Sequence, residues 1–141
     1  MISRTVLIAP EPFAALSAAR VAAALGRGLR AADPSLEVDL CPIEHGDLEP
    51  GELDALGFDE RMRAARAVVL GAGRLDERTL LGSATFELAT RARQAGVPAY
   101  AVAGENALSL FDARILDLQV VLQARDTRAL GRAGEKLAGL V

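Results

Sequence analysis

The residues best suited to chemistry in this sequence lie just after its third apolar run. Gly71 and Gly73 would let a ligand approach the backbone closely, and Arg74 would offer a planar guanidinium to a phosphate. Asp76 follows two residues later. These residues predict a phosphate-binding loop. The alternative is a tight strand-to-helix turn in which Asp76 and Thr79 cap a helical turn and Arg74 is solvated.

Gly82 and Ser83 open the next amphipathic segment. Backbone N–H groups at a helix start can donate to an anion, and the Ser83 hydroxyl can help, although serine at this position is equally suited to capping the helix. The expected cofactor-binding set is therefore Gly71, Gly73, Gly82 and Ser83. No Walker A pattern is present, and the Gly71-x-Gly73 pair lacks the third glycine of a dinucleotide fingerprint, which argues against NAD.

Five short apolar runs alternate with amphipathic segments along the chain. Continuous apolar runs are typical of strands covered on both faces, and parallel strands need helical crossovers. The pattern predicts an α/β three-layer sandwich, a doubly wound parallel sheet of about five strands. The order 2-1-3-4-5 is common for such sheets and would place the ligand-binding loops at residues 10–17 and 71–82. The expected strands are residues 5–9, 38–43, 67–70, 99–103 and 120–122, and the expected helices are residues 17–32, 58–65, 83–95, 108–116 and 127–140.

The apolar faces of these helices, which include Phe86, Phe111 and Leu137, are expected in the core. The length of 141 residues suits one domain, residues 1–141. A net charge of -3 without a Lys/Arg-rich run argues against nucleic-acid binding. No apolar stretch approaches the length of a membrane span, and no signal peptide is evident, so a cytoplasmic protein without membrane contact is expected.

Several further polar residues fall in predicted loops. His45 lies among acidic residues and has the ingredients of a metal site or an acid–base pair, but a solvated acidic loop is the commoner outcome, and no metal site is predicted. Glu11 and Glu105 follow the first and fourth predicted strands and are either ligand contacts or plain turn residues. Cys41, the sole cysteine, is expected as a small apolar residue at a strand end.

Two stretches of the chain carry a resemblance to a known family. The first runs from the first strand to the second and consists of Val6-Leu7-Ile8-Ala9-Pro10, Phe13, Ser17-Ala18, Val21-Ala22, Gly28-Leu29-Arg30, Pro34, Val38 and Pro42. The second is the more specific and consists of Gly71-x-Gly73-Arg74-Leu75-Asp76-x-x-Thr79-Leu80-x-Gly82, Gly96-Val97-Pro98 and Ala103-Gly104. Together they resemble the class of bacterial glycerate kinases that pair a Rossmann-like domain with an inserted second domain.

The resemblance implies that this chain is the Rossmann-like domain alone, because the second domain of those kinases is inserted near the counterpart of residues 46–58. It also implies ATP-dependent phosphoryl transfer to glycerate, with ATP and Mg²⁺ as cofactors. Arg74 and Asp76 would then be the catalytic residues.

The chain departs from the family pattern at three places. The family's Asp-Ser-Phe-Lys-Gly is Glu11-Pro12-Phe13-Ala14-Ala15 here, and its Ala-Asp-Gly-Gly-Glu-Gly-Thr is Glu44-His45-Gly46-Asp47-Leu48. In the loop after the third strand its Gly-Glu-Gly is Gly71-Ala72-Gly73 and its Gly-Lys is Gly82-Ser83. Phosphoryl transfer depends on cations that neutralise the transferring group, and losing one costs about 3–4 kcal/mol of barrier. The expectation is a retained phosphate- or nucleotide-binding loop with weak or absent catalysis.

Two other functions stay open at this point. Residues 71–83 also look like the glycine-spaced ATP loop of universal stress proteins, with both gaps one residue shorter, which would make the chain a non-enzymatic nucleotide-binding module. A remnant domain that forms a homodimer or binds another chain is the other alternative. An exposed apolar patch near residues 44–58 would favour that alternative.

Overall fold

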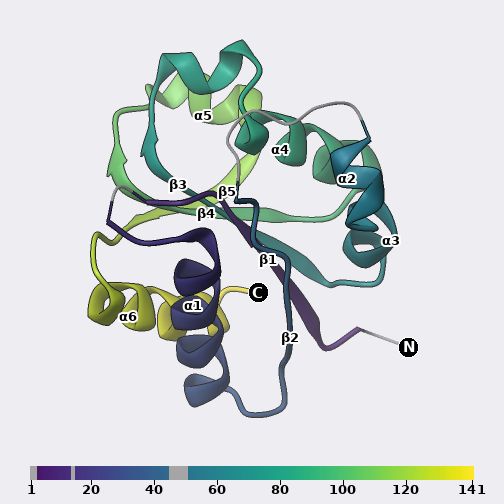
Figure 1. Ribbon diagram of the computed structural model, residues 1–141, viewed down its shortest axis with the longest axis vertical. Helices are drawn as coiled ribbons and strands as arrows, with labels where there is room; N and C mark the ends of the chain where they lie inside the picture. Colours follow the sequence, from purple (N-terminus) through teal and green to yellow (C-terminus); the bar gives the residue numbers. More distant parts are fainter. Residues whose placement is uncertain (1–2, 14, 45–50) are drawn as a thin grey trace.

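A computed structural model describes residues 3–13, 15–44 and 51–141. Strands and helices alternate along these residues, as the sequence predicts (Figure 1). The elements are β1 (Thr5–Pro10), α1 (Ala18–Ala32), β2 (Glu37–Leu40), α2 (Glu52–Ala55), α3 (Phe58–Arg63), β3 (Ala67–Leu75), the 3-10 helix η1 (Glu77–Leu81), α4 (Ala84–Ala95), β4 (Ala99–Asn106), α5 (Leu110–Leu116), β5 (Leu118–Gln123) and α6 (Thr127–Ala138).

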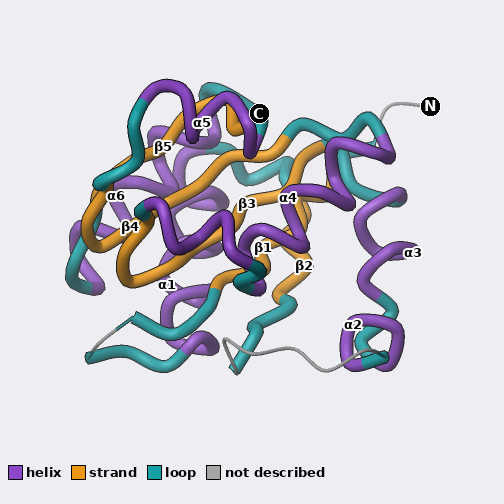
Figure 2. Tube along the Cα trace, turned by 90° about the horizontal axis from the view of Figure 1, so that it is seen from above, coloured by secondary structure: helices purple, strands orange, loops and turns teal. Residues whose placement is uncertain are grey.

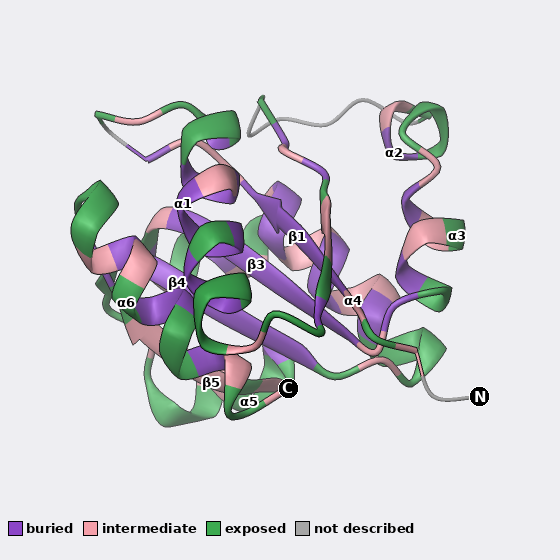
Figure 3. Cartoon of the chain, turned by 90° about the horizontal axis from the view of Figure 1, so that it is seen from below, coloured by how far each residue is buried: buried purple, intermediate pink, exposed green. Residues whose placement is uncertain are grey.

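The five strands form one parallel sheet, which confirms the predicted fold class, and their order is β2-β1-β3-β4-β5, which the sequence left open. β1, β3 and β4 occupy the middle and are buried along most of their lengths (Figure 3). Their continuous apolar runs meet helices on both faces, as expected for central parallel strands. β2 and β5 form the two edges of the sheet.

The helices divide between the two faces of the sheet. α1 and α6 lie side by side on one face, where Leu25, Leu29, Leu130 and Leu137 are fully buried (Figure 1). The other face is covered by α3, α4 and α5, and Phe58 is fully buried in its core. α2 and α3 lie at the end of the domain opposite α6 (Figure 2).

The helix starts follow local sequence signals. Ser17 and Ser83 cap α1 and α4, each accepting a hydrogen bond from a backbone N–H three residues later. Gly96 ends α4 in the left-handed conformation, with φ of 72°, where a side chain would be strained. These boundaries match the predictions because capping depends on residues a few positions apart in the chain.

Several expected strand bounds and one expected core residue are wrong. The third and fourth strands do not stop at Leu70 and Ala103 but continue to Leu75 and Asn106, because each pairs with the other to its end. The second strand ends at Leu40 and does not reach Ile43. Phe111 is not a core residue, since 71% of it is exposed, whereas Leu137 is fully buried and Phe86 is partly buried against the core. In the described part of the chain, no helix is both long and apolar enough to cross a membrane.

Candidate functional site

The glycine pair and Arg74 lie on a strand and not on a loop. Gly71, Gly73 and Arg74 all belong to β3, and Arg74 stands opposite Glu105 in the register with β4. The predicted loop of residues 71–82 therefore shrinks to the turn and 3-10 helix after Leu75. The physical reason is pairing with β4, which satisfies the backbone groups of this stretch.

Arg74 is held between two carboxylates. Its Nε lies 2.9 Å from Asp76 Oδ2, and its Nη1 lies 2.6 Å from Glu105 Oε2. The side chains of Arg74 and Glu105 are both about half exposed. The structure thus brings the two predicted catalytic residues, Arg74 and Asp76, together and adds Glu105 to them. The guanidinium of Arg74 forms ion pairs with carboxylates of the same chain.

Asp76 has a second role at the start of η1. Its carboxylate accepts a hydrogen bond from the Arg78 N–H, and the Thr79 hydroxyl oxygen accepts one from the Asp76 N–H. This reciprocal arrangement is a capping box. The alternative considered for Asp76 and Thr79, a capped helical turn, is therefore what the structure contains, while Arg74 is paired and not simply solvated.

The ion pairs shift the acid–base properties of this cluster. The hydrogen bond from Arg74 is the main cause that lowers the pKa of both Asp76 and Glu105, and the same bonds raise the pKa of Arg74. A carboxyl whose pKa is lowered by folding stabilises the fold above its ordinary pKa, and this stabilisation is lost as the pH falls through the lowered value. All three groups are charged at neutral pH.

We expect Arg74→Gln to raise the pKa of both Asp76 and Glu105 towards ordinary values. The substitution removes the guanidinium that favours their charged forms. An NMR titration of the side-chain carboxyl carbons measures both values. Asp33 is the internal control, because its pKa is lowered mainly by the side chain of Ser35 and should not change. Unchanged titration of Asp76 and Glu105 would show that Arg74 does not hold them in solution.

A carboxylate of the same chain, that of Glu11, is bound at the start of α4. The Ser83 hydroxyl accepts from Phe86 N–H and donates to the Thr79 carbonyl. Glu11, from the loop after β1, accepts hydrogen bonds from both the backbone N–H and the hydroxyl of Thr85. The positive end of a helix favours such a carboxylate. Glu11 thus lies where the sequence predicted that Gly82 and Ser83 would meet an external anion.

Gly71 makes room for the chain's own side chains. A Cβ at this position would lie 2.8 Å from the Pro10 Cβ and 3.5 Å from the Phe13 ring. Glu11 N–H also donates to the Gly71 carbonyl at 2.8 Å, so the bend after β1 lies beside β3, as the sequence suggested. Phe13 is only 6% exposed. The close packing of Pro10 against Gly71 leaves no room for a side chain at position 71.

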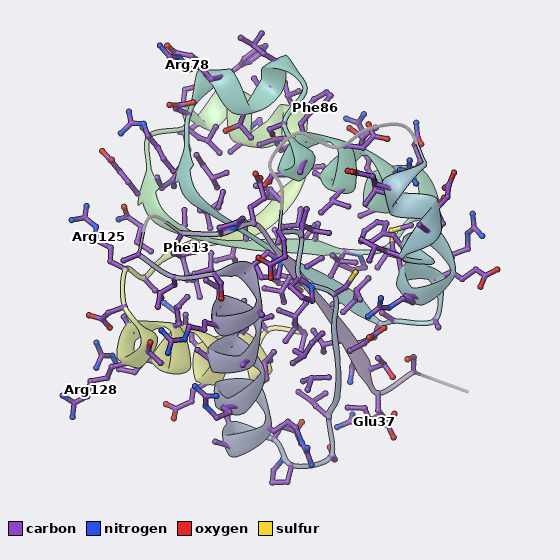
Figure 4. The ribbon with its side chains drawn as sticks, in the orientation of Figure 1. Phe13, Glu37, Arg78, Phe86, Arg125 and Arg128 are labelled. Carbon is purple, nitrogen blue, oxygen red and sulfur yellow. The ribbon has the colours of Figure 1, made fainter. Side chains whose placement is uncertain are left out.

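A cavity of about 300 Å³ lies instead at the carboxyl ends of β3 and β4. Figure 4 shows Phe13 and Arg125 on the same side of the molecule, from the loops after β1 and β5. Pockets at this edge are where parallel sheets bind ligands. Its lining residues are Phe13, Ala15, Gly73, Gly104, Glu105 and Arg125.

Sequence reasoning identified part of this lining. Gly73 was expected at the site, and Glu105 was noted as a residue at the end of a strand. Gly104 and Arg125 were not singled out as site residues. Gly104 carries a geometric requirement, since a Cβ there would lie 2.6 Å from the Gly73 carbonyl oxygen. Arg125 follows β5 directly, and a search for charged residues after every predicted strand would have found it.

The remaining candidates contribute less. His45 and its acidic neighbours at positions 47 and 49 lie outside the described residues, whereas Glu44 accepts a hydrogen bond from Ala19 N–H at the start of α1. Asn106 N–H donates to the Gln123 side chain. Cys41 is buried as predicted, and burial raises the pKa of its thiol. Within residues 3–13, 15–44 and 51–141, no three potential metal ligands cluster together.

The described residues do not fit ATP with Mg²⁺ as the family resemblance implied. Asp76 and Glu105 share one guanidinium, so a cation between them would have to displace Arg74. The cavity of about 300 Å³ is at the small end of ligand pockets, and most of a nucleoside triphosphate would lie outside it.

Comparisons with known proteins agree with this architecture. The chain is similar to a flavodoxin from the domain Archaea, with 13% identity, a TM-score of 0.53, and coverage of 96% of this chain and 97% of the flavodoxin. This likeness shows a flavodoxin-like α/β fold. No curated protein matches the sequence.

A family match covers more than half of the chain. The glycerate kinase family matches residues 50–135 of the 141. The range includes the motif from Gly71 to Gly82 and the cavity residues Gly104 and Arg125, whereas the N-terminal resemblance lies before it. The chain belongs to the glycerate kinase family.

Proposed function

We propose that this chain is a domain of the glycerate kinase family that binds a small organic or phosphate anion at the carboxyl ends of β3 and β4. The observation that carries the proposal is the cavity bounded by Gly73, Gly104 and Arg125. Glycines leave the backbone open to a ligand, and the arginine supplies a positive charge. Its position at the carboxyl edge of the parallel sheet supports a ligand site.

The proposed binding is accompanied by weak or absent phosphoryl transfer. Transfer needs cations free to neutralise the phosphoryl group and carboxylates free to hold a metal ion. Arg74 is engaged by two carboxylates, Asp76 also caps η1, and Glu11 is hydrogen-bonded to Thr85. Each of these groups would have to leave an internal partner before acting on ATP. Because these side chains are paired with other residues of the chain, the proposal favours ligand binding over ordinary kinase turnover.

The binding proposal is tested by titrating the protein with glycerate, inorganic phosphate and ATP with Mg²⁺, followed by amide NMR. We expect glycerate or phosphate to shift the amide signals of Gly73, Gly104 and Arg125, and the start of α2 to serve as an unaffected reference. A lack of shifts at the cavity with all three ligands would contradict the proposed site.

The catalytic part of the proposal is tested by a coupled assay of ADP release with glycerate, ATP and Mg²⁺. We expect rates far below the roughly 1–1,000 per second of ordinary enzymes. The same preparation must bind the anion, so that a low rate is not caused by unfolded protein. Turnover within the ordinary range would show that the internal ion pairs open during catalysis.

A second candidate function, binding of another copy of this chain, is favoured by one surface. Leu81 at the end of η1 is 83% exposed, and Leu110 and Phe111 at the start of α5 are 84% and 71% exposed. α5 contacts η1, so these side chains lie on neighbouring elements. Both elements also carry acidic and basic residues. In a dimer with twofold symmetry, acidic residues of one copy can pair with basic residues of the other.

Light scattering after size-exclusion chromatography over a range of concentrations tests this association. A dimer that Phe111→Asp converts to a monomer would support it. A wild-type monomer at all concentrations, or a dimer indifferent to Phe111→Asp, would contradict it. The sequence suggests an exposed apolar patch near residues 44–58, and among the described residues of that range Leu56, at 38%, is the large apolar side chain that is exposed.

A further inference from the structure

Arg125 is placed in the cavity by fixed backbone on either side of it. Ala124 N–H donates to the Ala103 carbonyl at 2.9 Å, which extends the pairing of β5 with β4 by one residue. Asp126 caps α6 by accepting a hydrogen bond from the backbone. The residue between them therefore has little freedom to move away from the end of β4.

The guanidinium of Arg125 is held by one of its nitrogens. Its Nε donates to the Gly104 carbonyl at 2.9 Å. Among the described residues, no carboxylate lies within ion-pair distance of Arg125, whereas Arg74 holds two. The two terminal nitrogens make no other hydrogen bond within the same residues, and Arg125 lines the cavity. Arg125 is an exposed residue, and a guanidinium anchored at Nε presents its two terminal nitrogens as a fork of donors that matches two oxygens of an anion.

We propose that Arg125 is the specificity-determining residue of this cavity, and that it recognises the carboxylate of a small organic acid. The inference rests on the proposed function, which places a small anion here without deciding which residue selects it. Arg125 comes from the segment after β5, and neither the predicted loops nor the predicted catalytic pair includes it.

Glu105 in the same lining favours a singly charged ligand. Its carboxylate pairs with Arg74 at 2.6 Å and also lies within the electrostatic influence of Arg125. A dianionic phosphate beside this carboxylate would be repelled more strongly than a monocarboxylate. The cavity therefore suits a singly charged organic acid better than phosphate.

The test compares glycerate with glycerol and inorganic phosphate by calorimetric titration. Glycerol keeps the hydroxyl groups but lacks the carboxylate. In the wild-type protein we expect glycerate to bind more tightly than phosphate, and glycerol to bind weakest. In Arg125→Met, the dissociation constant for glycerate should rise about tenfold or more, because a charged hydrogen-bonded contact is lost. Its preference for glycerate over glycerol should disappear.

Two variants control for effects on folding. Arg128→Met removes an arginine at the start of α6 that does not line the cavity (Figure 4), and it should bind glycerate within twofold of the wild type. Arg125→Lys keeps the charge without the fork, and its affinity should lie between those of the wild type and Arg125→Met. Thermal unfolding of each variant confirms that the protein tested is folded.

The outcomes separate the two proposals. If the wild type binds glycerate and Arg125→Met binds it equally well, the role of Arg125 is wrong while the cavity remains a binding site. If phosphate binds more tightly than glycerate, the carboxylate preference is wrong. If none of the three ligands binds the wild-type protein, the proposed function is wrong as well.

Discussion

Gly28→Ala should destabilise this protein by about 3 kcal/mol, because α1 and α6 touch through their backbones. A Cβ on Gly28 would lie 2.1 Å from the Gly131 carbonyl oxygen and 3.0 Å from the Glu135 nitrogen. The contact is reciprocal, since a Cβ on Gly134 would lie 2.4 Å from the Leu25 carbonyl oxygen. Backbone atoms cannot rotate aside like a side chain, so the helices would have to move apart.

Separation of the helices would also disturb the core beneath them. Leu25, Leu29, Leu130 and Leu137 are fully buried on this face of the sheet. Interiors are packed too densely for a shift of an ångström to leave these contacts intact. Urea unfolding followed by circular dichroism measures the effect as a lower midpoint at a similar slope.

The matched control is Gly131→Ala in α6. A Cβ at this position would meet no atom within 4 Å, and the residue lies inside a helix. Alanine is preferred over glycine in helices by up to about 1 kcal/mol, so this variant should be as stable as the wild type or more so. Equal midpoints for Gly28→Ala and Gly131→Ala would show that the helices do not approach so closely in solution.

The second large effect is expected for Phe58→Ala, which should lose about 3–5 kcal/mol. Phe58 is the first residue of α3, follows the left-handed Gly57 and is fully buried. Its ring packs in the core on the face opposite α1 and α6. Truncation would remove the buried ring and leave a cavity that the surrounding helices can fill only in part.

Phe111→Ala provides the comparison, because the same chemical change falls on a side chain that is 71% exposed. We expect its unfolding free energy to stay within about 0.5 kcal/mol of the wild type. Both variants can be measured by urea unfolding in one series. A loss of several kcal/mol in Phe111→Ala would mean that its surface is covered in solution, as the second candidate function requires.

The candidate site consists of a cluster of ion-paired residues and a cavity beside it. Arg74 forms ion pairs with Asp76 and Glu105 at the end of the sheet, and Glu11 accepts a hydrogen bond at the start of α4. Arg125 keeps donors available beside them. This division is the basis for proposing that the domain binds a small anion and transfers phosphoryl groups weakly or not at all.

Much of the fold could be predicted because its signals are local. Apolar runs marked all five strands, and Ser17, Ser83 and Gly96 marked helix ends through contacts within a few residues. The strand order could not be predicted from the sequence, although the structure has the order that is common for such sheets. The end of β3 was misplaced, because a strand continues as long as its neighbour pairs with it, and that pairing is not encoded locally.

The amino-acid sequence by itself determined the α/β class, the alternation of elements and the family, since all three depend on composition and on spacing along the chain. Tertiary structure alone decided that Arg74 meets Glu105, that Glu11 reaches Thr85 and that Phe111 faces solvent. It also brought Arg125 to the cavity. These contacts join residues far apart in sequence, and their geometry follows from strand register and helix packing, which side-chain periodicity does not specify.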